Sequence, residues 1–234
     1  MNNNTKKILQ FPDGFLWGTS TSSYQIEGGI VNDWSEWEKS PARIKQIEKS
    51  SENINNFISG QACDSYNRYE KDLTLVKNLN CGGFRLGIEW ARVEPEEGII
   101  IKKEMEHYRR ILTSAKNKGI KIVLTVWHWT NPTWVARQGG WTNKKTVDDY
   151  LRFTDLVARE LGNLVDFWIT LNEPMAHIGF GYIRGSFPPG KKLNFFSAGR
   201  VFFNLARAHN LAYEKIHEIL PDAVLTKLIP DGRA

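Results

Sequence analysis

Short apolar runs alternate along the chain with longer segments in which apolar residues recur every three or four positions. Runs of the first kind are typical of buried parallel strands, and segments of the second kind are typical of amphipathic helices. The predicted strands are Phe15–Thr19, Gly83–Ile88, Ile120–Trp127, Val165–Leu171 and Ala223–Leu228. The helices predicted between them are Asp64–Leu79, Lys103–Lys118, Thr146–Leu161 and Ser197–Leu220. This alternation predicts βαβ units and a parallel sheet.

The residues at the helix ends support these boundaries. Asp64 is expected to be the N-cap of the first helix. Gly119 and Gly162 follow the second and third helices, where a left-handed residue is expected to end a helix. Pro221 stops the fourth helix. The stripe of the first helix that should face the core is Tyr66, Tyr69, Leu73, Val76 and Leu79.

One segment does not follow this alternation of strand and helix patterns. Residues 28–60 are rich in Ser, Asn, Lys and Glu and have no clear period. We therefore expect a long excursion between the first strand and the first helix.

The spacing of the strands indicates how large the complete fold is. The midpoints of the predicted strands are on average about 52 residues apart, and a closed barrel of eight units would need roughly 416 residues. The sequence therefore predicts an α/β fold, an incomplete (β/α)8 TIM barrel of about five strands and four helices, with residues 1–234 in a single domain. The alternative is an open, doubly wound sheet of five strands that is complete in itself. No Gly-x-Gly-x-x-Gly loop follows the first strand, and this absence argues against the doubly wound sheet.

Composition excludes several classes of protein. With 41% hydrophobic and 24% charged residues, the chain has the balance of an ordinary globular domain and not that of a disordered or collagen-like one. No window of about 18 apolar residues is present, so no transmembrane helix and no membrane partner are expected. The polar segment Met1–Gln10 lacks the apolar stretch of a secretory signal, and Cys63 and Cys81 are expected to be reduced thiols. These features predict a cytoplasmic protein.

Charge and aromatic content narrow the choice of ligand. The net charge of +5 comes from 31 Lys and Arg against 26 Asp and Glu, spread in pairs along the chain, which favours a solvated surface over a nucleic-acid site. The histidines lack metal-ligand spacing and no nucleophile elbow occurs, so no metal and no cofactor are expected. Nine Trp residues, several beside turns and polar residues, suit stacking on a flat ligand face such as a sugar ring.

The candidate chemistry lies where the predicted strands end, because reactive groups of parallel α/β proteins gather there. Four segments at these ends combine polar residues with aromatic or acidic ones: Tyr24–Gly28, Glu89–Arg92, Trp127–Pro132 and Asn172–Pro174. Gln, His, Asn and Glu supply the donors and acceptors that sugar hydroxyls need. Glu173 can act as a positioned general acid when its surroundings favour the protonated form.

Each of these residues, taken alone, also has a structural interpretation. A single Glu173 is more often a capping or salt-bridging carboxylate, and a single His128 is more often a structural histidine. Any one of Trp34, Trp37, Trp134 and Trp141 is more often part of the core. The functional interpretation depends on their occurring together at several strand ends.

At these residues the sequence resembles glycoside hydrolase family 1, the β-glucosidase and β-galactosidase family of retaining enzymes. The resemblance follows the family's order over nearly the whole chain. It rests on Phe11–Thr19, Ser23–Gly28, Asp64–Tyr69, Phe84–Arg92, His128–Pro132, Gly139–Trp141, Asn172–Pro174, Gly181–Tyr182, Gly185, Pro188–Gly190 and Ala208–Asn210.

The resemblance implies a role for six residues. Glu173 matches the general acid/base, and Asn172 matches the donor to the 2-hydroxyl of the sugar. Gln25 and His128 match residues that bind hydroxyls of the non-reducing sugar, with Trp129 beside them. Arg85 matches the arginine that supports the nucleophile. A retaining glycosidase uses two carboxyl groups about 5 to 5.5 Å apart, and Glu173 can supply only one of them.

The family's nucleophile lies in a Glu-Asn-Gly motif that does not occur in this sequence. Glu27 and Glu89 match other family positions and are not expected to replace it. The resemblance therefore implies a retaining β-glycosidase acting on the O-glycosidic bonds of β-glucosides or related β-glycosides, with the nucleophile half absent and the chain inactive alone. Two alternatives are a non-catalytic carbohydrate-binding fragment and one half of a split glycosidase.

The expected partners follow from these alternatives. They are a small-molecule β-glycoside or oligosaccharide and a complementing C-terminal half. An open half-barrel also exposes apolar helix stripes and unpaired strand edges, so self-association is expected as well.

Overall fold

The computed structural model describes residues 10–50 and 52–225, and it contains one parallel sheet of five strands. The strands are β1 (Gly18–Ser20), β2 (Gly83–Gly87), β3 (Lys121–Trp127), β4 (Phe167–Leu171) and β5 (Val224–Leu225). They lie side by side in sequence order, whereas the order reverses in a doubly wound sheet. The predicted partial (β/α)8 barrel is therefore confirmed, and the doubly wound alternative is wrong.

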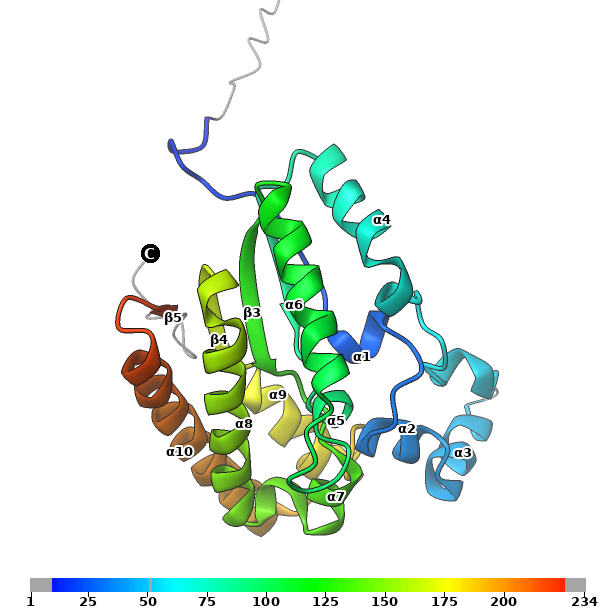
Figure 1. Ribbon diagram of the computed structural model, residues 1–234. Coiled ribbons are helices and arrows are strands. Elements are labelled where there is room, and N and C mark those ends of the chain that lie inside the picture. Colours follow the sequence, from blue (N-terminus) through cyan, green and yellow to red (C-terminus); the bar gives the residue numbers. More distant parts are fainter. Residues whose placement is uncertain (1–9, 51, 226–234) are drawn as a thin grey trace, which may run out of the picture.

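The four long helices lie between consecutive strands, as predicted. They are α4 (Ser65–Asn78), α6 (Lys102–Asn117), α8 (Lys145–Leu161) and α10 (Phe195–Ile219), each within two residues of its predicted ends. Figure 1 shows α6 and α8 in front of the sheet, with α10 beside α8. None of the helices within residues 10–50 and 52–225 is both long and apolar enough to cross a bilayer.

The two faces of the sheet differ in burial. Side chains that alternate toward the helices, such as Phe84, Leu124 and Trp168, are completely or almost completely buried in the core. Their neighbours on the opposite face, such as Arg85 and Ile169, are only partly buried. This second face would line the inside of a closed barrel. Its side chains are accessible here because five strands do not close a barrel.

Six shorter α-helices among the described residues were not predicted. They are α1 (Ser23–Ile26), α2 (Asp33–Glu38), α3 (Pro41–Glu48), α5 (Trp90–Val93), α7 (Thr133–Arg137) and α9 (Pro174–Ile178). Short turns of other helix types occur at η1 (Ile54–Phe57), η2 (Gly140–Thr142), η3 (Gly162–Leu164) and η4 (Gly179–Ile183). Figure 1 shows α1, α2, α5, α7 and α9 gathered at the end of the sheet where the strands terminate.

The predicted excursion at residues 28–60 is present before α4, and it contains two helices that were not predicted, α2 and α3. Both helices are too short to show a period, but their starts carry capping signals. The side chain of Asn32 accepts from the backbone N–H of Ser35 in a reciprocal capping box. Ser40 caps α3, and Pro41 occupies its first position.

The first strand begins three residues later than predicted. The apolar run that suggested it instead forms a partly exposed aromatic cluster, in which the rings of Phe11, Phe15 and Trp17 lie 4.7–4.9 Å apart. A Cβ on Gly18 would lie 2.8 Å from the carbonyl oxygen of Gly83, so this strand pair requires glycine. Of the predicted fifth strand, residues 226–228 lie outside the described residues.

The predicted details of the helix ends are confirmed only in part. Asp64 is in the N-cap position with a φ of 54°, but its carboxylate accepts from the Asn67 side chain and makes no capping bond. Gly162 is right-handed, because the chain continues into η3, and its lack of a Cβ instead makes room for Leu220. Leu79 is 67% exposed, although it was assigned to the buried stripe. Gly119 has the left-handed conformation that was predicted, with a φ of 71°.

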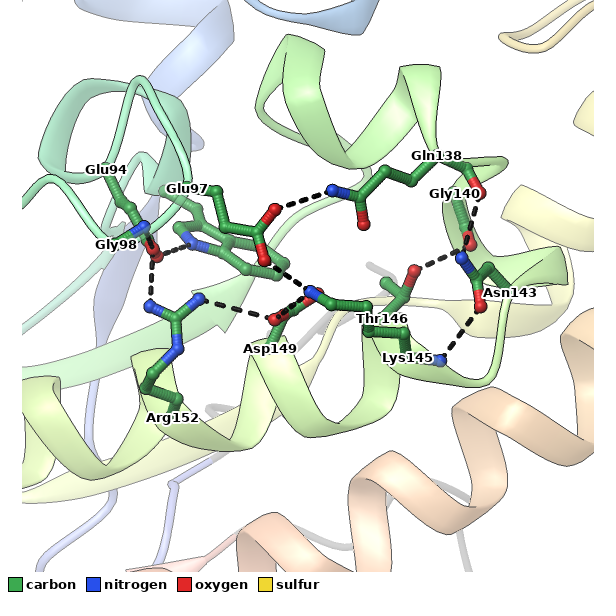
Figure 2. A network of polar contacts seen from close by, with 11 residues as sticks. Glu94, Glu97, Gly98, Gln138, Gly140, Asn143, Lys145, Thr146, Asp149 and Arg152 are labelled. Atoms are coloured by element: carbon green, nitrogen blue, oxygen red, sulfur yellow. Dashed lines mark hydrogen bonds and ion pairs between the residues drawn. The ribbon is translucent and has the colours of Figure 1, made fainter.

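A polar network ties the loop after β2 to α8 (Figure 2). Glu94 is completely buried and accepts from Trp90 Nε1 at 2.8 Å and from the backbone N–H of Gly98 at 2.7 Å. Arg152 of α8 donates to the same carboxylate. Figure 2 also shows Glu97, Gln138 and Lys145 linked by hydrogen bonds beside this carboxylate. The loops at the carboxyl end of the sheet are thus fixed to the helix layer beneath them.

Candidate functional site

Asn172, the residue after β4, is the centre of a cluster of polar side chains. Arg85 Nη2 donates to Asn172 Oδ1 at 2.5 Å, from β2 and across β3. Asn172 Nδ2 lies 3.1 Å from His128 Nε2. The backbone is fixed too, since Asn172 N donates to the carbonyl of Trp127 at 2.9 Å. Three of the six predicted site residues are therefore joined through their side chains.

Arg85 lies on the accessible face of the sheet and is held in place by a side chain of β3. Its Nε donates to Thr125 Oγ1 at 2.9 Å. Burial lowers the pKa of the Arg85 guanidinium, and the neighbouring Glu173 carboxylate acts in the opposite direction. The cluster thus has one fixed cation whose field reaches the Glu173 carboxylate.

His128 is neutral at physiological pH. Burial and the Arg85 charge lower the pKa of this imidazole to about 4. A neutral ring offers one donor and one acceptor nitrogen, which suits hydrogen bonds with a hydroxyl group.

Two of the predicted site residues adopt left-handed backbone conformations. Trp129 has a φ of 73° and Glu173 a φ of 40°. A positive φ is unusual for a large side chain, and strained residues of this kind cluster at functional sites. The conformation of Glu173, at the N-cap of α9, leaves its side chain exposed.

Trp129 forms an aromatic wall beside Asn172. Its Nε1 donates to the Asn172 carbonyl oxygen at 3.0 Å. The ring of Trp34 stacks on it with a centroid distance of 6.3 Å, and Phe187 contacts both rings. Trp34 comes from α2, so the segment between α1 and α4 contributes to the site.

Gln25 is exposed on α1 and forms no hydrogen bond with Asn172 or His128 within the described part of the chain. An indirect connection exists through the buried Glu89. Its Oε2 accepts from Ser23 Oγ at 2.9 Å and from Thr130 Oγ1 at 3.1 Å, two residues from Gln25 and His128, respectively. Glu89 therefore joins the ends of β1, β2 and β3.

The two other glutamates at strand ends are engaged in structural contacts. Glu27 is buried and accepts from Arg92 Nε at 3.0 Å and from the Tyr108 hydroxyl. Burial raises the pKa of Glu27 to about 7 and raises the pKa of Glu89 as well. Both carboxylates are thus buried and hydrogen-bonded to neighbouring side chains.

Three residues that hold this site in place, Thr125, Trp34 and Phe187, were not predicted as site residues from the sequence. Thr125 lies inside a predicted strand, and only its alternation with Val123 and Lys121 could have placed it on the accessible face. Trp34 was assigned more readily to the core, and Phe187 was not singled out. Their partners lie far away in sequence, so local patterns carry little signal for them.

The cluster has the chemistry of one wall of a polar cleft. It presents amide, imidazole and guanidinium groups beside an indole and the exposed Glu173 carboxylate. A separate hollow of about 480 Å³, lined by residues such as Trp37, Asn131 and Tyr182, includes none of the six predicted site residues. No group of three or more His, Cys, Asp or Glu among residues 10–50 and 52–225 could hold a metal ion.

The sequence matches the family model for glycosyl hydrolase family 1 over residues 7–230. It is 33% identical over 232 residues to β-glucosidase A of Thermotoga maritima, covering 96% of this chain and 50% of that protein. It is 30% identical over 222 residues to β-glucosidase A of Acetivibrio thermocellus, covering 92% of this chain and 47% of that protein. The chain thus spans about half the length of these two relatives.

Solved structures agree with this similarity. The β-glucosidase from Thermotoga maritima in complex with deoxynojirimycin superposes with a TM-score of 0.85 at 32% identity, covering 93% of this chain and 49% of that chain. The crystal structure of the AHE enzyme from Alicyclobacillus herbarius gives a TM-score of 0.84 at 29% identity, covering 94% and 49% of the two chains.

Proposed function

The chain belongs to glycosyl hydrolase family 1, and on this premise we propose that it provides the acid/base half of the active site of a retaining β-glycosidase. In this proposal Glu173 protonates the glycosidic oxygen as the bond breaks and then deprotonates the water that releases the sugar. Both steps require a carboxyl group at the open face of the cleft, with its orientation fixed.

The observation that carries the proposal is the hydrogen bond between Arg85 and Asn172 beside the exposed Glu173. The bond fixes a neutral donor, Asn172 Nδ2, next to the proposed acid. The same guanidinium is available to stabilise a second carboxylate on the accessible face. This arrangement supports a cleft in which an anionic nucleophile faces Glu173.

The substrate class we propose is a small β-glucoside or related β-glycoside. Asn172, His128 and Gln25 would bind the hydroxyls of its non-reducing sugar, and Trp129 would pack against the apolar face of the ring. The relatives support this choice, because two of them are named β-glucosidases and one solved relative holds deoxynojirimycin.

We propose that the nucleophile comes from residues outside this sequence, in a complementing half-barrel. Among the described residues Glu27 and Glu89 are engaged elsewhere, and the relatives are about twice as long. The partly exposed inner face of the sheet and its two edges, β1 and β5, would pack against those additional strands.

Co-expression tests this function. The chain is produced together with a polypeptide that carries strands six to eight of a family 1 barrel, and hydrolysis of an aryl β-glucoside is measured. We expect turnover only in the complemented sample, and we expect Glu173→Gln to lower kcat by about 10²- to 10⁴-fold. Full activity of Glu173→Gln would exclude the acid/base role.

The same experiment separates catalysis from simple carbohydrate binding. A non-catalytic binding fragment would bind glucose or cellobiose with micromolar affinity without a partner and would gain no turnover on co-expression.

Exposed aromatic residues on α10, among them Phe196 and Phe203, also support self-association when no partner is present. Sedimentation of the isolated chain as a single monomeric species would exclude that proposal.

The location we propose is the cytoplasm. Cys63 and Cys81 are both free thiols, which fits a reducing compartment. Oxidation of both thiols in the native protein would contradict this location.

A further inference from the structure

We propose that Thr125 is a positioning residue of this site, which acts through Arg85 and Asn172 to fix His128 as the tautomer with its proton on Nδ1. The inference rests on the proposed function, since it explains how the sugar-binding side chains are oriented before a ligand binds. It can nevertheless be tested without any turnover.

The first step is the anchoring of the guanidinium. Thr125 is completely buried in β3, and its hydroxyl oxygen accepts from Arg85 Nε at 2.9 Å. A guanidinium group is planar, so fixing Nε also fixes the directions of the other nitrogens. Nη2 is thereby directed at Asn172 Oδ1, 2.5 Å away.

The second step is the orientation of the amide. Arginine has only donors, so the atom of Asn172 that faces it must be the carbonyl oxygen. The NH₂ group of Asn172 then faces His128 Nε2 at 3.1 Å. Because an amide nitrogen can only donate, Nε2 must carry a lone pair, and the proton of the neutral ring is on Nδ1.

The third step concerns the other side of the ring. His128 Nδ1 is buried and has no hydrogen-bond partner among the described residues. No group among the described residues selects a tautomer on that side, so the selection comes from Asn172. Burial, together with the Arg85 charge, lowers the pKa of His128 to about 4 and keeps the ring neutral.

The consequence is a site with a fixed hydrogen-bond polarity. The second N–H of Asn172 remains available to a ligand, and the one lone pair of His128 Nε2 accepts from the first N–H. A hydroxyl that displaces the Asn172–His128 hydrogen bond can accept from Asn172 and donate to the freed lone pair of His128 Nε2. An ether or fluorine at the same position cannot donate, so the pair discriminates hydroxyls from groups that only accept.

The tautomer can be measured directly by ¹⁵N NMR of protein labelled at its five histidines, in solution or in the solid state and without sugar. The His128 signals are assigned by their loss in His128→Gln. We expect the wild type and Thr125→Ser to show a proton on Nδ1 only. Thr125→Val and the smaller Thr125→Ala, measured in parallel, remove the acceptor and should give a mixture of both tautomers.

Asn172→Asp provides the opposite test. A carboxylate can only accept, so an aspartate paired with Arg85 should place a proton on Nε2 of His128. Unchanged signals of the other four histidines show that each variant is folded. A proton on Nε2 in the wild type, or a single Nδ1–H tautomer in folded Thr125→Val and Thr125→Ala, would overturn the inference.

These outcomes are independent of catalysis. A wild-type Nδ1–H tautomer in a protein that gains no turnover on complementation would leave the inference standing and contradict the proposed function. Turnover together with a wild-type Nε2–H tautomer would do the reverse.

Discussion

The indole rings of Trp34 and Trp129 stack with their centroids 6.3 Å apart and their planes 16° apart. Trp129 is one of the predicted site residues, and its Nε1 is bonded to the carbonyl of Asn172. Trp34 lies in α2, inside the predicted excursion at residues 28–60. The stack therefore connects that segment to the candidate site and supports one face of Trp129.

Replacing this support should weaken ligand binding. In the complemented barrel we expect Trp34→Ala to lower the affinity for a glucose-type inhibitor by about fivefold, or about 1 kcal/mol, because Trp129 loses an aromatic contact. Isothermal titration calorimetry measures the change. Trp17→Ala removes another partly exposed indole, from the aromatic cluster that precedes β1, and should leave the affinity unchanged. Equal affinities of both variants would mean that the stack does not support the site.

The periodic elements could be predicted because their burial repeats along the sequence. In α6 the apolar residues that recur every three or four positions are all buried, at 7% exposure or less: Met105, Tyr108, Ile111, Leu112 and Ala115. A helix of this length turns the same face to the core several times, so a few exceptions do not hide the pattern. The fold class followed from these helices and from the apolar strands between them.

The contacts that shape the site could not be predicted in this way. Thr125 and Arg85 are 40 positions apart, and a threonine in a buried strand has the same local pattern with or without its partner. Trp34 lies in a helix of six residues, which is shorter than two turns. Such contacts depend on sheet register and loop packing, which local sequence does not encode.

The ion pair between Arg152 and Glu94 should contribute strongly to stability. Glu94 is completely buried, so Arg152→Met leaves a buried carboxylate with two neutral donors and no cation. We expect a loss of about 2 kcal/mol or more in the free energy of unfolding, measured by urea denaturation. Arg159→Met on the same helix breaks an exposed pair with Asp155 and should cost less than about 1 kcal/mol. Similar losses of unfolding free energy in both variants would show that the burial of Glu94 does not determine how much stability is lost.

Two glycines with nearly the same backbone conformation should respond differently to alanine. Gly28 has a φ of 81° and Gly98 a φ of 78°, so both substitutions impose a left-handed alanine that costs about 1 to 2 kcal/mol. A Cβ on Gly28 would also lie 2.2 Å from the carbonyl oxygen of Gln61, whereas nothing lies within 4 Å at Gly98. We expect Gly28→Ala to lower the melting temperature clearly more than Gly98→Ala. Equal shifts in the melting temperature of the two variants would mean that the backbone near Gln61 moves aside without a loss of stability.

The stability of the protein should depend on pH through His177. This ring is 2% exposed, both of its nitrogens lack partners among the described residues, and burial lowers its pKa to about 4. In the unfolded chain a histidine binds a proton near pH 6.5. Between these values the unfolded state therefore binds one more proton than the folded state, and stability falls as the pH falls.

Buried carboxyl groups act in the opposite direction and hide this effect in the wild type. Burial raises the pKa of both Glu27 and Asp33 to about 7, so these groups favour the folded state as the pH falls toward their unfolded values. The contribution of His177 is therefore isolated by comparing the wild type with His177→Phe. Between pH 8 and pH 5 the wild type should lose about 2 kcal/mol relative to this variant in urea denaturation. His217→Gln, at an exposed position on α10, should follow the wild type. If the difference between the wild type and His177→Phe stayed constant from pH 8 to pH 5, the buried imidazole would not be held neutral in the folded state.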